Sequence, residues 1–323
     1  MENASMRQSP VFNAHFRQRL ARPVYLKCEA AGQPVAYVCI IEIGLPGFKC
    51  GAVIDGPVAC GERAQFEASL PALIIWLQRR GLVFVRFSHK EQSILEGVGR
   101  QHHTIEGNPL PFVPRYSGEL VVDLAAEDDR LLAGFQQIAR QEIRRAREAG
   151  CVVQQSSDPE AFRQIWPIFV DRARVKGIRV AGVKEYEGMF RLSPRPDLVR
   201  LYTAYYQGQA VYAAVFLREK NMVHYFLGAL DATALGKQST PSCLVHWQAM
   251  RDYRQLGCRW YNLGARSGPV YAFKKKFRPQ ELPSAGACTL VFGSVRFWLW
   301  TGIFLRVYEG GQKLLRLVRR TGG

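Results

Sequence analysis

A repeated order of elements constrains the fold of this 323-residue chain more than any other feature. In each half, alternating apolar residues predict a hairpin and a third strand, and a helix ending at a glycine then precedes a further strand. The expected strands are 24–29, 35–43, 51–54 and 82–87 in the first half, and 201–206, 211–217, 222–230 and 258–263 in the second. The expected helices are 62–80 and 241–256.

The two halves keep a common register without a gap. Three pairs share one offset of 176 residues (208 − 32, 231 − 55 and 257 − 81): Gly32 with Gly208, Asp55 with Asp231, and Gly81 with Gly257. Because a shared element order at a fixed offset is typical of a repeat, the sequence predicts an internal duplication.

The second copy ends in a cationic motif. A strand at 258–263 is followed by a turn at Gly264, Gly268 and Pro269, and then by three lysines, Lys274, Lys275 and Lys276, between two phenylalanines. Glycine allows a ligand to approach the backbone closely, and cationic side chains attract anions. The motif therefore predicts an anion-binding site.

A strand-like run and a basic helix lie between the copies. Residues 120–124 are apolar except for Asp123, and 128–149 have an apolar face at helical spacing before Gly150. Arg140, Arg144, Arg145 and Arg147 crowd the end of this helix. Two interpretations stay open: cations complement the negative end of the helix dipole, or their guanidinium groups bind phosphate.

The net charge of +17 and the pI near 9.8 favour an acidic partner. Candidates are RNA, a nucleotide-linked or phosphorylated substrate, and an anionic membrane surface. The eight cysteines show no Cys-x-x-Cys spacing, which predicts no metal site and favours a reducing compartment. With no signal-peptide pattern at the N-terminus, we expect a cytoplasmic protein, at the inner face of the membrane if it touches one.

The C-terminal tail has a composition of its own. An apolar run at 297–305 is too short to span a bilayer, which takes about 20 residues, and lies between Arg296 and Arg306. Further on, leucines alternate with Lys313, Arg316 and other basic residues. The tail is either an interfacial element in peripheral contact with a membrane or a terminal helix packed on the first domain. No oligomeric state is predicted.

Two of these motifs resemble a known family. Tyr-Asn-Leu-Gly at 261–264 followed by Phe-Lys-Lys-Lys-Phe at 273–277 resembles the closing signature of Fem-type peptidoglycan bridge aminoacyltransferases and their GNAT-fold relatives. That family has Tyr-Asp-Phe-Gly and Phe-Lys-x-x-Phe-Gly, so Asn262 replaces an aspartate and Arg278 a glycine. The Val-Asp-Leu strand with its arginine-rich helix is similar too, and the likeness covers about residues 118–281.

The resemblance implies an α/β (α+β) fold of tandem GNAT-like domains, each a mixed central sheet flanked by helices. The expected domains are 1–125, which the C-terminal tail can complete, and 151–290. Residues 126–150 are expected to form a connecting helix, and 291–323 a tail.

The implied function is that of an acyl- or aminoacyl-transferase forming an amide on a cell-envelope precursor, of peptidoglycan or polysaccharide. The donor would be aminoacyl-tRNA or acyl-CoA, with no tightly bound cofactor, and the partner an anionic substrate: tRNA, or a nucleotide-linked or lipid-linked precursor. One alternative is an acyl-CoA-dependent N-acyltransferase acting on exopolysaccharide or lipid-linked amines. Another is a non-enzymatic membrane-surface or RNA-binding protein on a degenerate GNAT scaffold.

Polar residues on the strands 222–230 and 258–263 become the candidate site. Tyr225 and Tyr261 would donate protons to an oxyanion or leaving group, and His224 would act as the base. The candidate substrate-binding residues are Arg140, Arg144, Arg145, Asn262, Tyr271, Lys274, Lys275 and Lys276. Segment 234–242 lacks the Arg-x-x-Gly-x-Gly pattern of CoA-binding loops, although Gly236, Lys237 and Ser239 are suited to binding phosphate.

Overall fold

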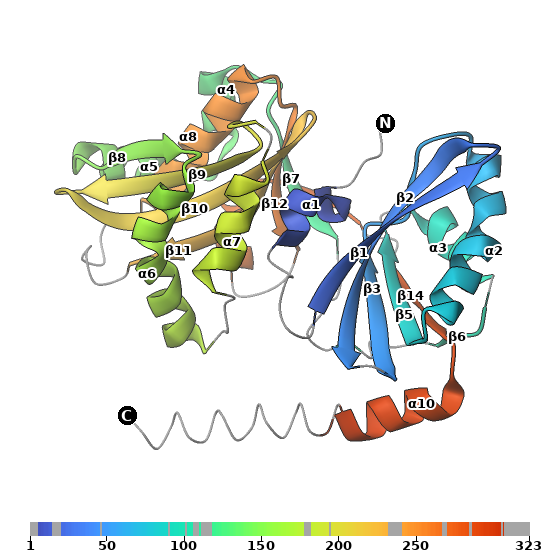
Figure 1. The fold of residues 1–323 in the computed structure, drawn as a ribbon. Coiled ribbons are helices and arrows are strands. Elements are labelled where there is room, and N and C mark those ends of the chain that lie inside the picture. The colour runs from blue at the N-terminus through green and yellow to red at the C-terminus, as the bar shows by residue number, and fades with distance from the viewer. Residues whose placement is uncertain are drawn as a thin grey trace. The chain divides into compact units, whose positions relative to one another are not determined.

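The computed structural model divides the chain into two units (Figure 1). Unit 1 comprises residues 1–8, 16–116 and 285–323, and unit 2 comprises 9–15 and 117–284. The structure describes residues 6–14, 21–45, 47–89, 91–100, 102–105, 110, 118–177, 182–193, 195–231, 241–266, 270–283, 286–304 and 306.

Unit 1 is a mixed sheet with helices on both faces. The strands run in the order β1-β2-β3-β5-β14-β6, with β4 paired to β2. They are β1 (Ala21–Ala30), β2 (Gln33–Leu45), β3 (Phe48–Ile54), β4 (Val58–Ala59), β5 (Leu82–His89), β6 (Thr104–Ile105) and β14 (Gly286–Val291). The helices are η1 (Met6–Gln8), α2 (Arg63–Arg79), α3 (Gln92–Gly99), α10 (Ser294–Leu299) and a π-helical turn, Trp300–Phe304. Apolar residues of α2 and α3 form the core on one face, and α10 covers the other.

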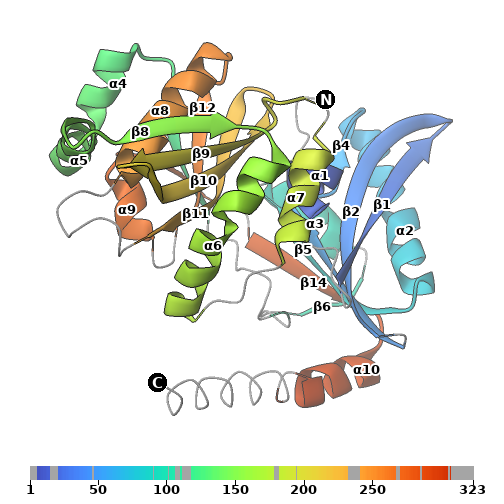
Figure 2. The ribbon, with the colours of Figure 1, turned by 60° about the vertical axis from the view of Figure 1, so that its left-hand side comes forward.

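Unit 2 is a second mixed sheet, covered on both faces. Its order is β13-β7-β12-β11-β10-β9-β8. The strands are β7 (Glu119–Asp123), β8 (Val152–Ser156), β9 (Val199–Tyr206), β10 (Gln209–Glu219), β11 (Met222–Leu230), β12 (Trp260–Ala265) and β13 (Gln280–Leu282). The helices are α1 (Pro10–Asn13), α4 (Asp128–Gly134), α5 (Gln137–Glu148), α6 (Pro159–Lys176), α7 (Val183–Arg191), α8 (Ser242–Gln255) and α9 (Tyr271–Lys275). Figure 2 shows α6 and α7 on one face of the sheet and α8 and α9 on the other.

The hairpins and helix ends repeat between the units as the duplication predicts. Ala30 pairs with Gln33 in β1–β2, and Tyr206 pairs with Gln209 in β9–β10. Both turns have two residues with positive φ, 49° and 74° in unit 1 and 49° and 79° in unit 2. Such values define the tight turn that suits the twist of a hairpin. The helices α2 and α8 are each followed by a glycine with positive φ, Gly81 and Gly257.

The segment between the copies differs from its prediction. The single helix expected over 128–149 is two helices, α4 and α5, because Phe135 between them is extended (φ −70°, ψ 160°) and its ring is buried. Both helices and β7 lie in unit 2, which therefore begins earlier than the predicted boundaries. Conversely, most of β14 lies within the predicted second domain, 151–290, but the strand pairs with β5 in the sheet of unit 1.

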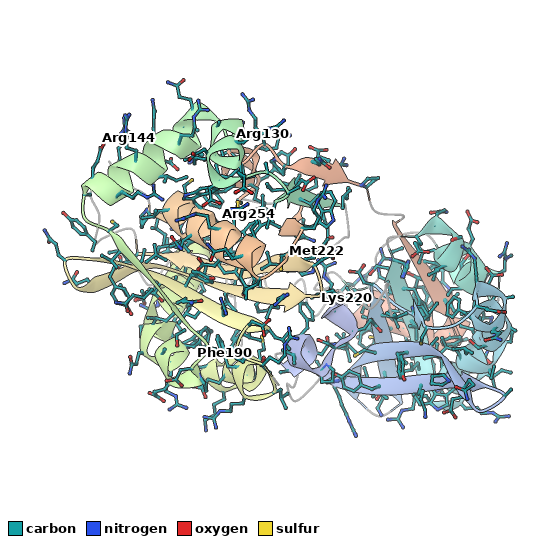
Figure 3. All side chains as sticks on the ribbon, turned by 90° about the horizontal axis from the view of Figure 1, so that it is seen from above. Arg130, Arg144, Phe190, Lys220, Met222 and Arg254 are labelled. Atoms are coloured by element: carbon teal, nitrogen blue, oxygen red, sulfur yellow. The ribbon has the colours of Figure 1, made fainter. Side chains whose placement is uncertain are left out.

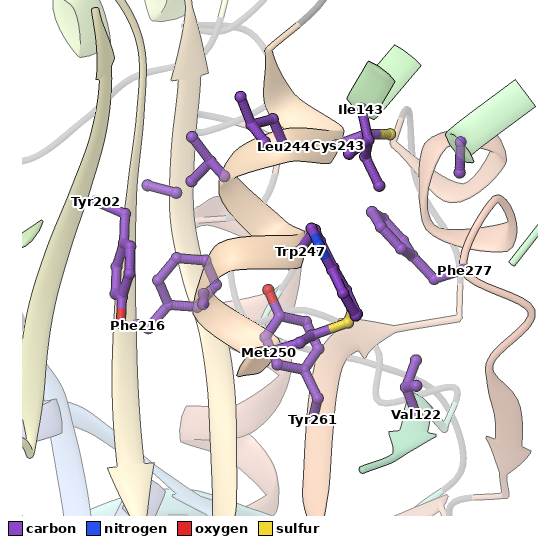
Figure 4. Close-up of a cluster of buried hydrophobic side chains, with 14 of the residues drawn as sticks. Val122, Ile143, Tyr202, Phe216, Cys243, Leu244, Trp247, Met250, Tyr261 and Phe277 are labelled. Atoms are coloured by element: carbon purple, nitrogen blue, oxygen red, sulfur yellow. The ribbon is translucent and has the colours of Figure 1, made fainter. Parts of the chain in front are cut away.

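The core of unit 2 holds α8 against the sheet. Figure 4 shows Trp247 and Met250 of α8 among Phe216, Tyr261 and Phe277. The ring of Phe135 meets both Trp247 and Phe277 edge-on, at 5.7 and 5.2 Å between centroids. Since buried aromatic rings contribute much packing area in a fixed geometry, this cluster fixes the position of α8 along the strands.

Among the described residues, no helix combines the length and the apolar character needed to cross a membrane.

Candidate active site in unit 2

Two parallel strands of unit 2 separate part-way along their length. The β11–β12 pairing consists of three pairs and ends at His224 with Asn262, although β11 continues to Leu230. Irregularities follow in both strands: the register slips between Val215 and Phe216 where β10 pairs with β11, and between Asn262 and Gly264 where β12 pairs with β7. Bulges bend a strand and end its pairing. Backbone groups of 225–230 are thereby left outside the ladder with β12.

The side chain of Lys274 reaches this point from α9. It is 5% exposed, and its Nζ donates to the carbonyl of Ala265 at 3.0 Å. The same Nζ lies 3.7 Å from where a Cβ on Gly264 would stand. Burial lowers the pKa of the Lys274 ammonium, and the nearby carboxylate of Glu119 opposes that shift. We call the surroundings of this ammonium the Lys274 site.

Buried polar groups on the sheet complete the Lys274 site. Asn262 donates from Nδ2 to the Glu119 carboxylate at 2.8 Å and accepts the backbone N–H of Gly264 at 2.7 Å. Asn262 is fully buried and Glu119 is nearly so. A buried carboxylate and a buried ammonium stabilise one another where either alone would be costly. Gly264 has a φ of +78°, which favours glycine.

A hydrogen-bonded group of aromatic side chains lies beside the Lys274 site. His246 of α8 bonds the hydroxyl of Tyr261 through Nδ1 at 2.7 Å and that of Tyr212 through Nε2 at 3.1 Å. The ring of Tyr225 meets the His246 imidazole at 4.6 Å. We call Tyr212, Tyr225, Tyr261 and His246 the Tyr–His cluster.

Close packing at Gly228 holds the hydroxyl end of this cluster. A Cβ on Gly228 would stand 2.8 Å from the hydroxyl of Tyr212 and would also collide with the hydroxyl of Tyr225. The two tyrosines therefore converge over a position where only a hydrogen fits.

Burial sets the protonation of the Tyr–His cluster. It lowers the pKa of His246 to about 3, with the charge of Lys274 acting in the same direction. The imidazole is therefore neutral at neutral pH, with one donor nitrogen and one acceptor. Burial also raises the pKa of Tyr212, Tyr225 and Tyr261, so their hydroxyls remain protonated. The cluster supplies neutral O–H donors rather than a base.

The structure brings together part of the predicted site. Tyr225 and Tyr261 meet around His246, and Lys274 lies with Asn262. His224 precedes Tyr225 on the strand and so points to the opposite face of the sheet, with its Nε2 3.4 Å from the Glu219 carboxylate. It is not grouped with the tyrosines.

The other lysines of the motif make ion pairs elsewhere. Lys275 and Tyr271 both contact Glu281, at 3.2 and 3.1 Å. Lys276 pairs with Glu142 at 2.6 Å. Of the three consecutive lysines, Lys274 is the buried one, because a helix turns successive side chains to different faces.

The arginines of α5 lie on its exposed side. Arg140 donates to the carbonyl of Ala133 at 2.6 Å, and Arg144 lies 3.6 Å from Glu148; Arg145 is exposed as well. Figure 3 shows Arg144 on the outer edge of unit 2, away from Met222 at the start of β11. These arginines are not gathered at the Lys274 site. The predicted phosphate-binding residues Gly236, Lys237 and Ser239 lie outside the described residues.

Three members of the site were not predicted from the sequence: His246, Tyr212 and Glu119. His246 occupies a core position in the apolar face of α8, where periodicity alone predicts packing. Glu119 directly precedes the predicted strand 120–124. The signal available for His246 and Tyr212 was the 176-residue offset, which aligns them with apolar Leu70 and Ala36.

Comparison with known proteins finds a family model that matches part of the chain. Residues 133–275, which include α8, β11, β12 and Lys274, match the family model described as Acetyltransferase (GNAT) domain. The fold of the whole chain is that of tandem GNAT proteins. Both findings confirm the fold predicted from the sequence and the GNAT part of the resemblance.

Solved structures extend this likeness over nearly the full chain. FemX has a TM-score of 0.74 at 12% identity, with 93% of this chain and 95% of that chain covered. The C-terminal domain of a putative lysylphosphatidylglycerol synthetase from Agrobacterium fabrum has a TM-score of 0.61 at 14% identity, with 94% of this chain and 92% of that chain covered. A tandem GNAT protein from the clavulanic acid biosynthesis pathway has a TM-score of 0.54 at 11% identity, with 86% of this chain and 85% of that chain covered. Among curated protein sequences, none matches this chain.

Proposed function

We propose that this chain is an acyl- or aminoacyl-transferase that forms an amide at the Lys274 site of unit 2. The observation that supports it is a buried ammonium at the point where β11 and β12 separate. Burying an ammonium is costly even beside a carboxylate, so its presence there favours a role in binding or catalysis.

The chemistry follows from the groups present. When an amine attacks an acyl carbon, negative charge develops on the carbonyl oxygen, and a fixed donor in a dry site stabilises it. Lys274 has three N–H donors, and among the described residues the Ala265 carbonyl accepts one of them. The protonated hydroxyl of Tyr225 is suited to donate to the departing thiol or ribose oxygen.

The backbone of β11 offers a second means of binding. Residues 225–230 pair with β10 but lie beyond the ladder with β12, and an extended part of a donor can form strand-like hydrogen bonds along that side of β11. This favours a donor with amide groups along its length, such as acyl-CoA, while the net charge of +17 favours any phosphate-rich donor, including aminoacyl-tRNA.

For the acceptor we propose an amine of a cell-envelope precursor, nucleotide-linked or lipid-linked. FemX and a domain of a putative lysylphosphatidylglycerol synthetase share the fold, and the lipid product named for the second supports an envelope role. We place the reaction in the cytoplasm, because the eight cysteines are free thiols in the structure.

A donor screen on the purified chain tests the proposal. Radiolabelled aminoacyl-tRNA and acyl-CoA are each offered with a mixture of envelope amines, and amide product is measured for wild type, Lys274→Met and Lys275→Met. We expect one donor class to give product. Loss of the buried cation should lower the rate by about 100-fold or more, as removal of one oxyanion donor does.

Lys275→Met is the matched control. Lys275 is the next residue, half-exposed and paired with Glu281, so its loss should change the rate by less than about threefold. Equal rates for wild type and Lys274→Met would contradict the proposed site, and product from neither donor would contradict the proposed activity.

A further inference from the structure

An exposed apolar surface follows the last strand of unit 1. Four side chains of α10 and the π-helical turn after it are exposed by 75, 73, 44 and 60%: Val295, Trp298, Leu299 and Ile303. We call these four residues the α10 patch. Isolated exposed apolar residues are ordinary, but a group of this size on one short segment marks an interaction surface.

The other side of the same segment anchors it to unit 1. Phe297 and Trp300 are 8% and 3% exposed, and both rings meet Phe84 of β5 edge-on, at 5.4 and 5.9 Å. Because these two rings are held in the core, the α10 patch is presented outward on a fixed element.

The charged residues within the α10 segment, from 294 to 306, are of one sign. Arg296 within α10 and Arg306 just after the turn are both exposed. The sequence has no acidic residue between Glu281 and Glu309, and Lys313, Arg316, Arg319 and Arg320 follow. Apolar side chains with an indole ring and surrounding cations are the composition of elements that lie in the interface of an anionic membrane.

We propose that the α10 patch inserts into the surface of a bilayer containing anionic phospholipid. The indole of Trp298 lies at the level of the headgroups, and Arg296 and Arg306 face lipid phosphates. A second copy of the chain is a poor occupant, since each copy has a net charge of +17 and the two would repel. The inference is independent of which donor unit 2 uses.

Vesicle sedimentation of the full chain tests the proposal. Binding is measured to phosphatidylcholine vesicles with and without phosphatidylglycerol, for wild type and Trp298→Glu/Ile303→Glu. We expect wild type to bind the anionic vesicles and to release them as salt is raised. The double variant should bind at least about tenfold more weakly, because two inserted apolar groups become charged.

Val152→Glu/Val175→Glu is the control variant. Val152 of β8 and Val175 of α6 are 56% and 77% exposed and lie in unit 2, so this variant adds the same two negative charges without touching the α10 patch. It should reduce binding by less than about twofold. Equal losses in the control and the double variant would overturn the proposal, as net charge alone would then explain binding.

Two further results would overturn it. One is unchanged vesicle binding by the double variant. The other is a wild type that ignores anionic vesicles but sediments as a dimer, with the double variant monomeric, because the α10 patch would then join two copies.

Discussion

The two units share their topology but differ at four buried positions. At the 176-residue offset, Ala36, Leu70, Val85 and Val98 of unit 1 correspond to Tyr212, His246, Tyr261 and Lys274 of unit 2. All eight are less than a tenth exposed. Packing supports the alignment: α3 approaches Leu70 at Gly97, and α9 approaches His246 at Phe273. One unit has an apolar core where the other has hydroxyls, an imidazole and an ammonium.

The extent of parallel strand pairing beside these positions also differs between the units. In unit 1, β3 pairs with β5 as far as Ile54 with Ser88, and Asp55 N–H continues to the Ser88 carbonyl at 2.8 Å. In unit 2 the β11–β12 pairing stops after three pairs. Polar groups in a core lower stability unless they are satisfied, so a core that retains them beside separated strands points to chemistry. We infer that unit 1 is structural and unit 2 catalytic.

Substitutions at the equivalent positions 98 and 274 should show the largest difference in stability between the units. Val98→Lys puts an ammonium into an apolar core without a carboxylate, and we expect a loss of about 3–5 kcal/mol in the free energy of unfolding. Lys274→Met removes the ammonium near the buried Glu119 carboxylate but leaves the hydrogen bond from Asn262 to it, so we expect a smaller loss, of about 1–2 kcal/mol. Urea unfolding of both variants measures the two free energies. Equal losses would show that the two units tolerate a buried ammonium equally well.

Acid should destabilise unit 2 through His246. Its pKa of about 3 in the folded state lies below that of an unfolded histidine, so the unfolded chain binds the extra proton as pH falls. The contribution of neutral His246 to the free energy of unfolding is therefore fully present above about pH 6.5. Below that pH it falls by about 1.4 kcal/mol per pH unit, down to about pH 3. Unfolding of wild type and His246→Leu as a function of pH measures this term. An identical acid dependence in the two proteins would show that His246 does not contribute.

Replacing His246 by leucine, the residue at the equivalent position of unit 1, should lower stability less than Val98→Lys does. His246→Leu leaves the hydroxyls of Tyr212 and Tyr261 without their partner, which we expect to cost about 1–3 kcal/mol. Adding Tyr212→Phe and Tyr261→Phe should restore much of the stability but none of the lost transferase activity. Thermal unfolding and rate measurements on the same samples separate the two effects, and a triple variant as active as wild type would refute a catalytic role for the cluster.

The smallest effect is expected at Gly228. A methyl group there meets the hydroxyls of Tyr225 and Tyr212, and small shifts of the two rings can relieve the contact, so stability should fall by about 1 kcal/mol, the low end of the range for overpacking. The rate of transfer should fall by about tenfold as Tyr225 leaves its position. Tyr225→Phe is the control, because Gly228→Ala should have little further effect on the rate in that background.

The sequence was informative where local patterns decide the structure. The hairpins, helix ends and cationic motif follow from turn glycines and apolar alternation, and the fixed offset revealed the duplication. Tyr225 and Tyr261 were identified because they lie on strands that the duplication placed at the centre.

What the sequence did not reveal depends on tertiary packing. Nothing local distinguishes Lys274 from Lys275, and only the docking of α9 turns one ammonium inward. His246 fits the apolar period of its helix, and the imidazole becomes notable only through two distant tyrosines. The exchange of β7 and β14 between the halves is equally hidden, because a strand's partner is a long-range property.

Hydrogen exchange distinguishes a catalytic unit 2 from a structural unit 1. Coenzyme A and tRNA are each added in turn, and backbone protection is compared between β11, β12 and α9 of unit 2 and β3, β5 and α3 of unit 1. We expect one of the two to protect residues 222–230, 260–265 and 271–275 and to leave 48–54, 82–89 and 92–99 unchanged. Protection in unit 1, or equal protection in both units, would show that the donor does not bind at the Lys274 site alone and would refute this division of roles.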